Sequence, residues 1–513
     1  MNLFKILTNV GGMTTLSRVL GFIRDTIIAR VFGVGLATDA FFVAFKIPNL
    51  LRRISAEGAF TQSFVPILSE YKEKNKKFEL HIFINRVATL LGIFLVIITL
   101  LGIFAAPWLI YISAPGFISD PQKFNLTVDL LRIIFPYIFF ISLVSMAGGV
   151  LNTFGKFSVP AFTPVWLNIS FIIAALFFAE FFSEPIFVLA WAVFFGGILQ
   201  LTFQIPFLKK IGCLPSLDFN FNDPGVWRVV KLMGPSILGV SVAQISLLIN
   251  TVFASFLAVG SVSWLYYADR LIEFPAGVLG VALSTVLLPS LSKSIANKKE
   301  SEYSSLVNWG IKLGILSGIP ASAALVTLSI PLITTLFYYG AFQDTDVLMT
   351  HYALIAYSIG LIGLIQIKII APAFYAQQNV KTPVKVAIFT LFCTQFMNLL
   401  FIGIFQHAGL ALAIGLGACI NAGLLFYFLQ KSKSFKIDSN IFKFIFKVLI
   451  STIIMTAVLF YFKGSTEDWL NYSAASRVSN LFFLISVGTA VYFISLKFLG
   501  IELTKFLKKN HNY

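Results

Sequence analysis

Ionisable side chains lie inside several of the longest apolar stretches of this chain. The two N-terminal stretches, residues 6–32 and 36–69, contain Arg18, Arg24, Asp25, Arg30, Asp39, Lys46, Arg52, Arg53 and Glu57. Two later stretches contain Asp269, Arg270, Glu273 and Lys368. Basic residues outnumber acidic ones in this set by eight to five. An excess of arginine suits a phosphate or pyrophosphate ligand, because the guanidinium group makes paired, charge-assisted hydrogen bonds to phosphate oxygens.

Four of these side chains follow a regular spacing. Asp39, Lys46, Arg53 and Glu57 are separated by seven, seven and four residues, which places them on one stripe of an ideal α-helix. A helix rises about 27 Å over these 18 residues, which is most of the membrane thickness. A charged residue at the centre of a membrane-spanning helix costs roughly 2.5–3.5 kcal/mol. We therefore expect these side chains to face a water-filled cavity or to form ion pairs.

Ion pairing is the main alternative to ligand binding. For Arg24, Asp39 and Glu57 the two interpretations are equally good: these residues form ion pairs that hold the first two helices together, or they contact the substrate. Pairing or snorkelling is the preferred interpretation for Asp25, Arg30 and Lys46. The basic residues outnumber the acids that could pair with them. We therefore prefer an anion-binding role for four arginines, which are Arg18, Arg52, Arg53 and Arg270.

The elements that carry these residues are predicted to be transmembrane helices. The 513 residues are 58% hydrophobic and 12% charged, about half the charged fraction of a soluble protein. Apolar runs of about 20 residues recur along the chain without the alternation of barrel strands. We predict an all-α polytopic membrane protein with fourteen transmembrane helices, near residues 6–32, 36–69, 83–112, 126–153, 160–182, 185–208, 226–258, 262–292, 304–338, 347–376, 383–404, 408–430, 441–462 and 477–499.

Loop charges predict the orientation. With the N-terminus inside, the inner segments hold 26 basic residues, and the outer ones hold only Lys123, Arg132, Lys463 and Arg477. This bias predicts that both termini are cytoplasmic. It also explains the net charge of +16 without nucleic acid, because the basic residues do not form one folded face. Three scattered cysteines indicate no metal site, and the chain has no phosphate-binding loop for ATP.

Short similarities in the same order suggest two related halves. Residues 29–35 (ARVFGVG) match 254–260 (ASFLAVG), and three further matches follow at offsets of 219–225. We predict two six-helix lobes in a parallel repeat around a central cavity, at residues 1–215 and 216–435. Residues 436–513 then form two accessory transmembrane helices and a cytoplasmic tail.

Four stretches of the chain carry a family resemblance. They resemble the MurJ (MviN) family of bacterial lipid II flippases, and they are residues 17–33 (SRVLGFIRDTIIARVFG), 37–71 (ATDAFFVAFKIPNLLRRISAEGAFTQSFVPILSEY), 266–293 (YYADRLIEFPAGVLGVALSTVLLPSLSK) and 382–385 (TPVK). That family belongs to the multidrug/oligosaccharidyl-lipid/polysaccharide exporter superfamily. The resemblance implies transport of undecaprenyl-pyrophosphate-linked peptidoglycan precursor to the periplasmic leaflet of the inner membrane by alternating access, and no enzymatic activity.

The resemblance also assigns roles by position. The implied substrate-binding residues are Arg18, Arg24, Asp39, Arg52, Arg53, Ser263, Asp269, Arg270 and Glu273. Glu57 and Lys368 resemble the pair that forms a thin periplasmic gate. The two C-terminal helices resemble a groove for the polyprenyl tail. The implied partners are lipid II and membrane lipid, contacts with the cell-wall synthesis machinery remain open, and neither a cofactor nor a metal is implied.

Three rival functions make different predictions. A multidrug exporter of the same superfamily would need an acidic cavity, whereas arginine is in excess here; a flippase for another polyprenyl-linked oligosaccharide would share the arginines. A membrane-embedded enzyme acting on polyprenyl-linked sugars would need catalytic acids near an outer loop, and the outer loops are short. A scaffold without transport activity would leave the charges within the membrane unexplained.

Overall fold

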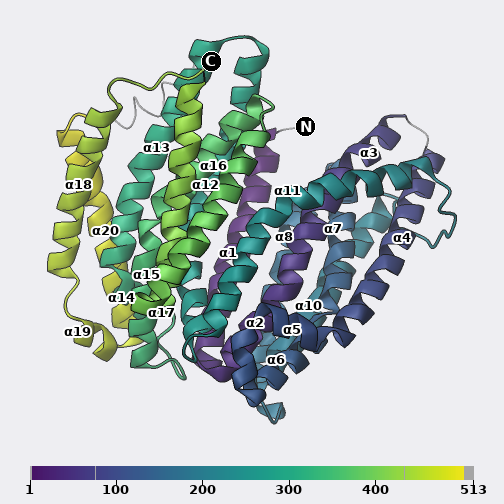
Figure 1. The fold of residues 1–513 in the computed structure, drawn as a ribbon, viewed down its shortest axis with the longest axis horizontal. Helices are drawn as coiled ribbons and strands as arrows, with labels where there is room; N and C mark the ends of the chain where they lie inside the picture. Colours follow the sequence, from purple (N-terminus) through teal and green to yellow (C-terminus); the bar gives the residue numbers. More distant parts are fainter. Residues whose placement is uncertain (1–2, 75–76, 433, 502–513) are drawn as a thin grey trace. The chain divides into compact units, whose positions relative to one another are not determined.

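The computed structural model describes residues 3–74, 77–432 and 434–501, and within this part of the chain every regular element is a helix (Figure 1). Side chains are described there except at residues 3–10, 55–57, 77, 238–240, 243 and 278–286. The chain forms two compact units, Met1–Ser263 and Trp264–Tyr513. The two units are defined by how densely their residues contact one another, which does not test the repeat. The lobe boundaries at 215 and 435 therefore remain a prediction.

The first unit contains the helices that carry most of the predicted charges. Its elements are α1 (Leu3–Phe32), α2 (Leu36–Leu51), η1 (Arg52–Phe60), α3 (Thr61–Glu73), α4 (Lys77–Phe104), α5 (Ala106–Ser113), η2 (Pro115–Ser119), α6 (Pro121–Ile134), α7 (Tyr137–Thr153), α8 (Ser158–Phe162), α9 (Pro164–Phe177), η3 (Ala179–Phe181), α10 (Phe187–Lys210) and α11 (Pro224–Ser255). The helix α12 (Ser261–Ala296) begins in this unit and continues into the second.

The second unit continues with eight further helices among the described residues. They are α13 (Glu300–Thr327), α14 (Ser329–Leu336), α15 (Asp344–Ile359), α16 (Leu361–Ala376), α17 (Lys381–Lys431), α18 (Ile441–Phe462), α19 (Thr466–Asn471) and α20 (Ala474–Phe498). The accessory helices α18 and α20 pack side by side, and α18 also packs against α13 (Figure 1).

Each predicted transmembrane segment is occupied by one helix or by consecutive helices. Several segments are interrupted, at Pro136 between α6 and α7 and at Gly360 between α15 and α16, for example. Helix α17 spans two predicted segments, with non-helical backbone angles at Gln406 that separate its halves. Among the described residues, nine helical stretches are long and apolar enough to cross a membrane, and the count of fourteen remains a prediction.

The outer surfaces of these helices fit lipid rather than water. In the most apolar 18-residue stretch of α18, only 28% of the residues are buried, and the same holds for α20. Both stretches are strongly hydrophobic. Large apolar side chains such as Phe442, Phe460 and Phe482 are exposed. Contiguous apolar surface of this kind is unfavourable in water and favourable in hydrocarbon. The all-α membrane fold expected from composition is therefore confirmed.

The second predicted span differs from a straight α-helix. Residues Arg52–Phe60 form a π-helix, in which backbone hydrogen bonds reach one residue further than in an α-helix. The stripe predicted from spacings of seven, seven and four assumed 3.6 residues per turn, so it is wrong beyond Leu51. Asp39 is fully buried whereas Arg53 is exposed, and the two side chains therefore do not share one environment.

Candidate functional site

Arg24 lies in a buried polar site between α1 and α9. Its guanidinium group donates to Asp25 Oδ1 through Nε at 2.9 Å and Nη2 at 2.7 Å, and to Asn168 Oδ1 through Nη1 at 3.1 Å. The group also lies 5.3 Å from the centre of the Phe171 ring, a cation–π contact. Arg24 is only 7% exposed. Ion pairing, the alternative interpretation of Arg24, is therefore what this structure contains.

Asn168 is a member of this site that sequence reasoning missed. Its Nδ2 donates to the Ser17 carbonyl at 3.0 Å while its Oδ1 accepts from Arg24. One amide thus fixes both ends of the α1 segment that contains Arg18, which is half-buried. Helix α1 runs through Gly21 without a break. A polar residue within an apolar helix was the available signal, but its spacing from Arg24 in sequence is 144 residues.

Asp39 occupies a second buried site, at the start of α12. Its Oδ2 accepts from Lys123 Nζ at 2.9 Å and from the Gly260 backbone N–H at 2.8 Å. Its Oδ1 accepts from the backbone N–H of Ser263 at 2.9 Å and from Ser263 Oγ at 2.7 Å. Gly260 has a φ of 97°, a conformation that favours glycine and aims its N–H at the carboxylate. Asp39 therefore caps α12 from another helix, where the dipole stabilises a negative charge.

Lys123 lies before the predicted segment 126–153, and the predicted start of that segment is wrong. Helix α6 begins at Pro121 rather than near 126, because Asp120 caps it by accepting from the N–H groups of Gln122 and Lys123 at 3.1 Å each. Lys123 is consequently helical and only 4% exposed. A lysine in the first turn of a helix opposes the helix dipole, and its ion pair with Asp39 offsets that cost. The Asp-Pro start was readable in the sequence, but the ion pair was not.

The other predicted arginines of the first unit are more accessible. Arg52 is half-buried and its Nε donates to Asn49 Oδ1 at 3.3 Å. Arg53 is exposed, and Arg18 is half-buried on α1. The structure therefore separates the predicted basic residues into Arg24, which is enclosed by side chains of its own unit, and Arg18, Arg52 and Arg53, which retain surface for a ligand.

The predicted residues of the second unit lie on consecutive turns of α12. Arg270 donates to Glu273 Oε2 at 2.6 Å and to the Tyr266 hydroxyl at 3.2 Å, and it lies 5.0 Å from the Tyr266 ring centre. The Arg270 side chain is 29% exposed and that of Glu273 is 56% exposed. Asp269 is exposed as well. This cluster has one guanidinium group and two carboxylates. The guanidinium attracts an anion, and the carboxylates repel it.

Comparison with known proteins identifies the family. Residues 28–479 match the family model described as "Lipid II flippase MurJ". The chain belongs to the MurJ family. A curated relative from Burkholderia cenocepacia, named lipid II flippase MurJ, is 46% identical over 515 residues and is aligned over 99% of this chain and 100% of its own length.

Solved structures agree with this assignment. A structure described as lipid II flippase MurJ in the inward closed conformation is similar with a TM-score of 0.80 and 26% identity, over 98% of this chain and 99% of that one. An inward-facing multidrug transporter of the MATE family is similar with a TM-score of 0.66 over 80% of this chain and 93% of that one. Its 15% identity shows a shared fold alone.

The gate pair that the MurJ resemblance implied is only partly described. The Nζ of Lys368 donates to the Ala276 carbonyl at 3.0 Å. The side chain of Glu57 lies outside those that the structure describes, so the pairing of Glu57 with Lys368 remains a prediction. Glu57 itself lies within the π-helical segment, where its position relative to Arg53 differs from that on an α-helix.

Arg477, at the start of the predicted segment 477–499, is a second basic residue that is buried. It is 6% exposed in the first turn of α20 and donates to the carbonyls of Trp469, Leu470 and Tyr338 at 3.0, 2.9 and 2.8 Å. Its guanidinium also stacks 4.6 Å from the Tyr338 ring centre. Because carbonyl groups accept its hydrogen bonds, Arg477 joins α19 and α20 to the chain that follows α14.

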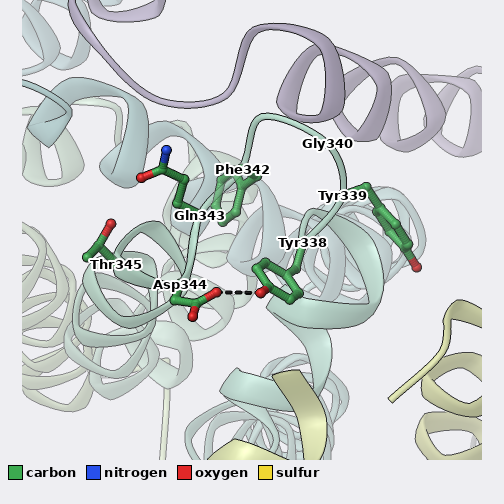
Figure 2. Close-up of a pocket in the computed structure, with 7 residues that line it drawn as sticks. All are labelled: Tyr338, Tyr339, Gly340, Phe342, Gln343, Asp344 and Thr345. Carbon is green, nitrogen blue, oxygen red and sulfur yellow. Dashed lines mark hydrogen bonds between the residues drawn. The ribbon is translucent and has the colours of Figure 1, made fainter. Parts of the chain in front are cut away.

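A pocket lies beside this junction, within the second unit (Figure 2). Its volume is about 560 Å³, and the Tyr338 hydroxyl donates to Asp344 at its edge. None of the predicted substrate-binding residues lines it; the lining residues are Tyr338, Tyr339, Gly340, Phe342, Gln343, Asp344 and Thr345.

Replacing Lys123 by methionine should destabilise the protein. The substitution leaves the buried Asp39 charge without its cation, and removing one member of a buried ion pair costs about 3–5 kcal/mol. We expect a clear fall in the thermal midpoint of the purified protein, measured by size-exclusion chromatography after heating. The double variant Lys123→Met/Asp39→Asn should recover part of the loss, because both charges are then absent.

The matched control for this prediction lies on the same helix. Arg132 forms an ion pair with Asp129, but both side chains are about half exposed, and such pairs contribute little. Arg132→Met should therefore leave the thermal midpoint almost unchanged. Equal midpoints for Lys123→Met and Arg132→Met would show that the Asp39 site is not a stabilising ion pair.

Proposed function

We propose that this chain is a lipid II flippase. It moves undecaprenyl-pyrophosphate-linked disaccharide-pentapeptide from the cytoplasmic to the periplasmic leaflet of a bacterial inner membrane, for peptidoglycan synthesis. The observation that carries the proposal is the MurJ family match over residues 28–479, together with relatives of that name aligned over nearly the whole chain. The transmembrane arginines supply the chemistry that a pyrophosphate needs.

The arginines that retain exposed surface are the proposed pyrophosphate ligands. These are Arg18, Arg52 and Arg53 of the first unit and Arg270 of the second. Asp25 and Asn168 hold the Arg24 guanidinium group in place, and its positive charge adds to the attraction for an anion. Arg24 contacts the headgroup directly only if the anion reaches the face of its guanidinium plane. Asp269 and Glu273 are proposed to contact the sugar or peptide, since carboxylates accept hydrogen bonds from hydroxyl and amide groups.

The mechanism we propose is alternating access. The headgroup enters a site open to the cytoplasm while the polyprenyl tail stays in lipid, and a conformational change then opens the same site to the periplasm. Asp39 and Ser263 act in this change rather than as ligands, because their polar atoms are engaged with each other at the start of α12. If the emptied site carries net positive charge, the membrane potential would drive its return to the cytoplasm-facing state and so make transport directional. Moving one charge through 100 mV is worth about 2.3 kcal/mol.

Several finer features belong to the same proposal. We place both termini in the cytoplasm, from the distribution of basic residues. The protein acts as a transporter without enzymatic activity, and Glu57 with Lys368 forms its thin periplasmic gate. Its partners are lipid II and membrane lipid, and any contact with the cell-wall synthesis machinery would be made through exposed loops.

The decisive experiment measures which leaflet holds lipid II. In cells depleted of the host flippase, expression of this chain should make the precursor accessible to a probe that is restricted to the outer leaflet. A chain that instead exports cationic drugs would raise drug resistance and leave the precursor shielded. A flippase for another polyprenyl-linked oligosaccharide would also leave lipid II shielded.

Arg18→Ala or Arg270→Ala should abolish growth of such depleted cells. Each variant removes a guanidinium group assigned to the pyrophosphate, so lipid II should remain shielded while the protein reaches the membrane at normal amounts. Arg132→Ala serves as the matched control, because it removes an exposed arginine outside the proposed site, and it should support normal growth. Growth of both site variants at the control rate would contradict the anion site.

A further inference from the structure

Two connectors, each following a set of six predicted transmembrane segments, are hydrogen-bonded to helices of their own units. We define the first connector as residues 211–223, between α10 and α11, and the second as 432–440, between α17 and α18. Both lie on the predicted cytoplasmic side. The first rests on α4 and the second on α13, which are the helices of the third and ninth predicted segments.

The first connector is bound by three residues within about one turn of α4. Asn85 Oδ1 accepts from the Ser216 N–H, and Thr89 Oγ1 accepts from the Asp218 N–H, both at 3.0 Å. Between them, Arg86 donates to Asp218 Oδ2 at 3.0 Å and to Asp223 Oδ2 at 3.1 Å.

The same contacts extend to the start of α11. Asp223 is the N-cap of that helix and accepts from the Gly225 N–H at 2.8 Å. The Asn220 N–H and then Arg86 hold the pKa of the Asp218 carboxyl below its usual range, so this charge persists at neutral pH. Arg86 therefore joins the connector and the first turn of α11 to one helix.

The second connector is bound in a similar way by α13. Asn308 Oδ1 accepts from the Asp438 N–H at 3.0 Å, and Asn308 Nδ2 donates to the Lys436 carbonyl at 2.8 Å. Ser304 Oγ both donates to the Lys436 carbonyl and accepts from the Lys436 N–H, each at 3.0 Å. The Nζ of Lys312 pairs with Asp438 Oδ2.

An asparagine on the helix and an aspartate in the connector recur at repeat-related positions in the two halves. Asn85 and Asn308 are 223 residues apart, and Asp218 and Asp438 are 220 apart. Both offsets fall within the range of the sequence repeat, 219–225. In each connector the aspartate also accepts from the backbone N–H of an asparagine two residues later, Asn220 at 3.0 Å and Asn440 at 2.9 Å. The asparagine contacts differ, because Asn85 accepts from the Ser216 N–H, two residues before the connector aspartate, whereas Asn308 accepts from the N–H of Asp438 itself. What the two connectors share is an aspartate that pairs with a cation of the neighbouring helix, Arg86 on α4 or Lys312 on α13.

We propose that these are two analogous clamps, which hold each connector on the third helix of its own repeat throughout the transport cycle. The first clamp makes the start of α11 move with α4. The second makes the start of α18 move with α13, so the accessory helices follow the second repeat. The existence of the clamps does not depend on which substrate the protein moves. Their persistence during transport rests on the proposed function.

Amide hydrogen exchange tests the clamps directly, because they protect the N–H groups of Ser216, Asp218, Lys436 and Asp438. Asn85 uses only its oxygen in the contacts described above, whereas Asn308 uses oxygen and nitrogen. Asn85→Asp should therefore preserve slow exchange in the first connector. Asn308→Asp should speed exchange in the second connector about tenfold, because a carboxylate cannot donate to the Lys436 carbonyl.

Each connector serves as the control for the other. Asn85→Leu should speed exchange in residues 211–223 and leave 432–440 unchanged, and Asn308→Asp should do the reverse. Fast exchange of both connectors in the unaltered protein would overturn the clamps. Equal effects of Asn85→Asp and Asn308→Asp would overturn the assigned geometry.

Crosslinking tests whether the first clamp stays closed during transport. In a chain with Cys213, Cys393 and Cys419 replaced by alanine, Asn85→Cys and Ser216→Cys are joined by a short bifunctional thiol reagent. Transport of lipid II that continues after crosslinking supports a permanent clamp, and transport that stops and returns on reduction overturns it. Failure of the unaltered chain to flip lipid II would contradict the proposed function, and hydrogen exchange would still decide whether the clamps exist.

Discussion

A charge within a membrane-spanning segment must find a partner, and Asp39 shows how completely this chain meets that requirement. Its two carboxylate oxygens accept four hydrogen bonds, from Lys123, Gly260 and Ser263, in a site without exposed surface. Because the site is buried among protein atoms, each contact replaces a hydrogen bond to water that the folded chain cannot make. The same requirement explains the amide that contacts Arg24 and the carbonyls that contact Arg477. Buried charges thereby fix which helices meet, although lipid provides little hydrophobic drive for helices to associate.

The helices were predictable because hydropathy and length report directly on the lipid environment. Starts and breaks were partly readable, as at Asp120, where an N-cap followed by proline opens α6 earlier than the apolar run suggests. Tertiary pairing was not readable. Nothing in the sequence links Lys123 to Asp39 or Asn168 to Arg24, because those pairs depend on how separate helices pack. The π-helix was also hidden, since its residues would satisfy an α-helix equally well. The candidate site was therefore found by residue type, while its internal connections required the structure.

The predicted basic residues are not equivalent in the folded chain. Arg24 is enclosed by an acid, an amide and an aromatic ring, whereas Arg53 is exposed. Arg270 shares its guanidinium with a neighbouring carboxylate on the same helix. Guanidinium groups already satisfied by protein contacts are rigid and bind an anion with little reorganisation, while exposed ones adapt to it. Membership of the MurJ family places this mixture of enclosed and exposed cations in a protein whose relatives are named lipid II flippases.

The π-helical segment Arg52–Phe60 has a geometric consequence for the helix that contains it. A π-helix holds one more residue in each hydrogen-bonded ring than an α-helix does. Converting one such ring to α geometry changes the register by one residue, and one residue corresponds to about 100° of rotation around the axis. A change of hydrogen-bond partners within these nine residues would thus turn α3 relative to α2 without unfolding either. Torsion of this kind reorients side chains while the ends of the helix barely move, and it requires no loop.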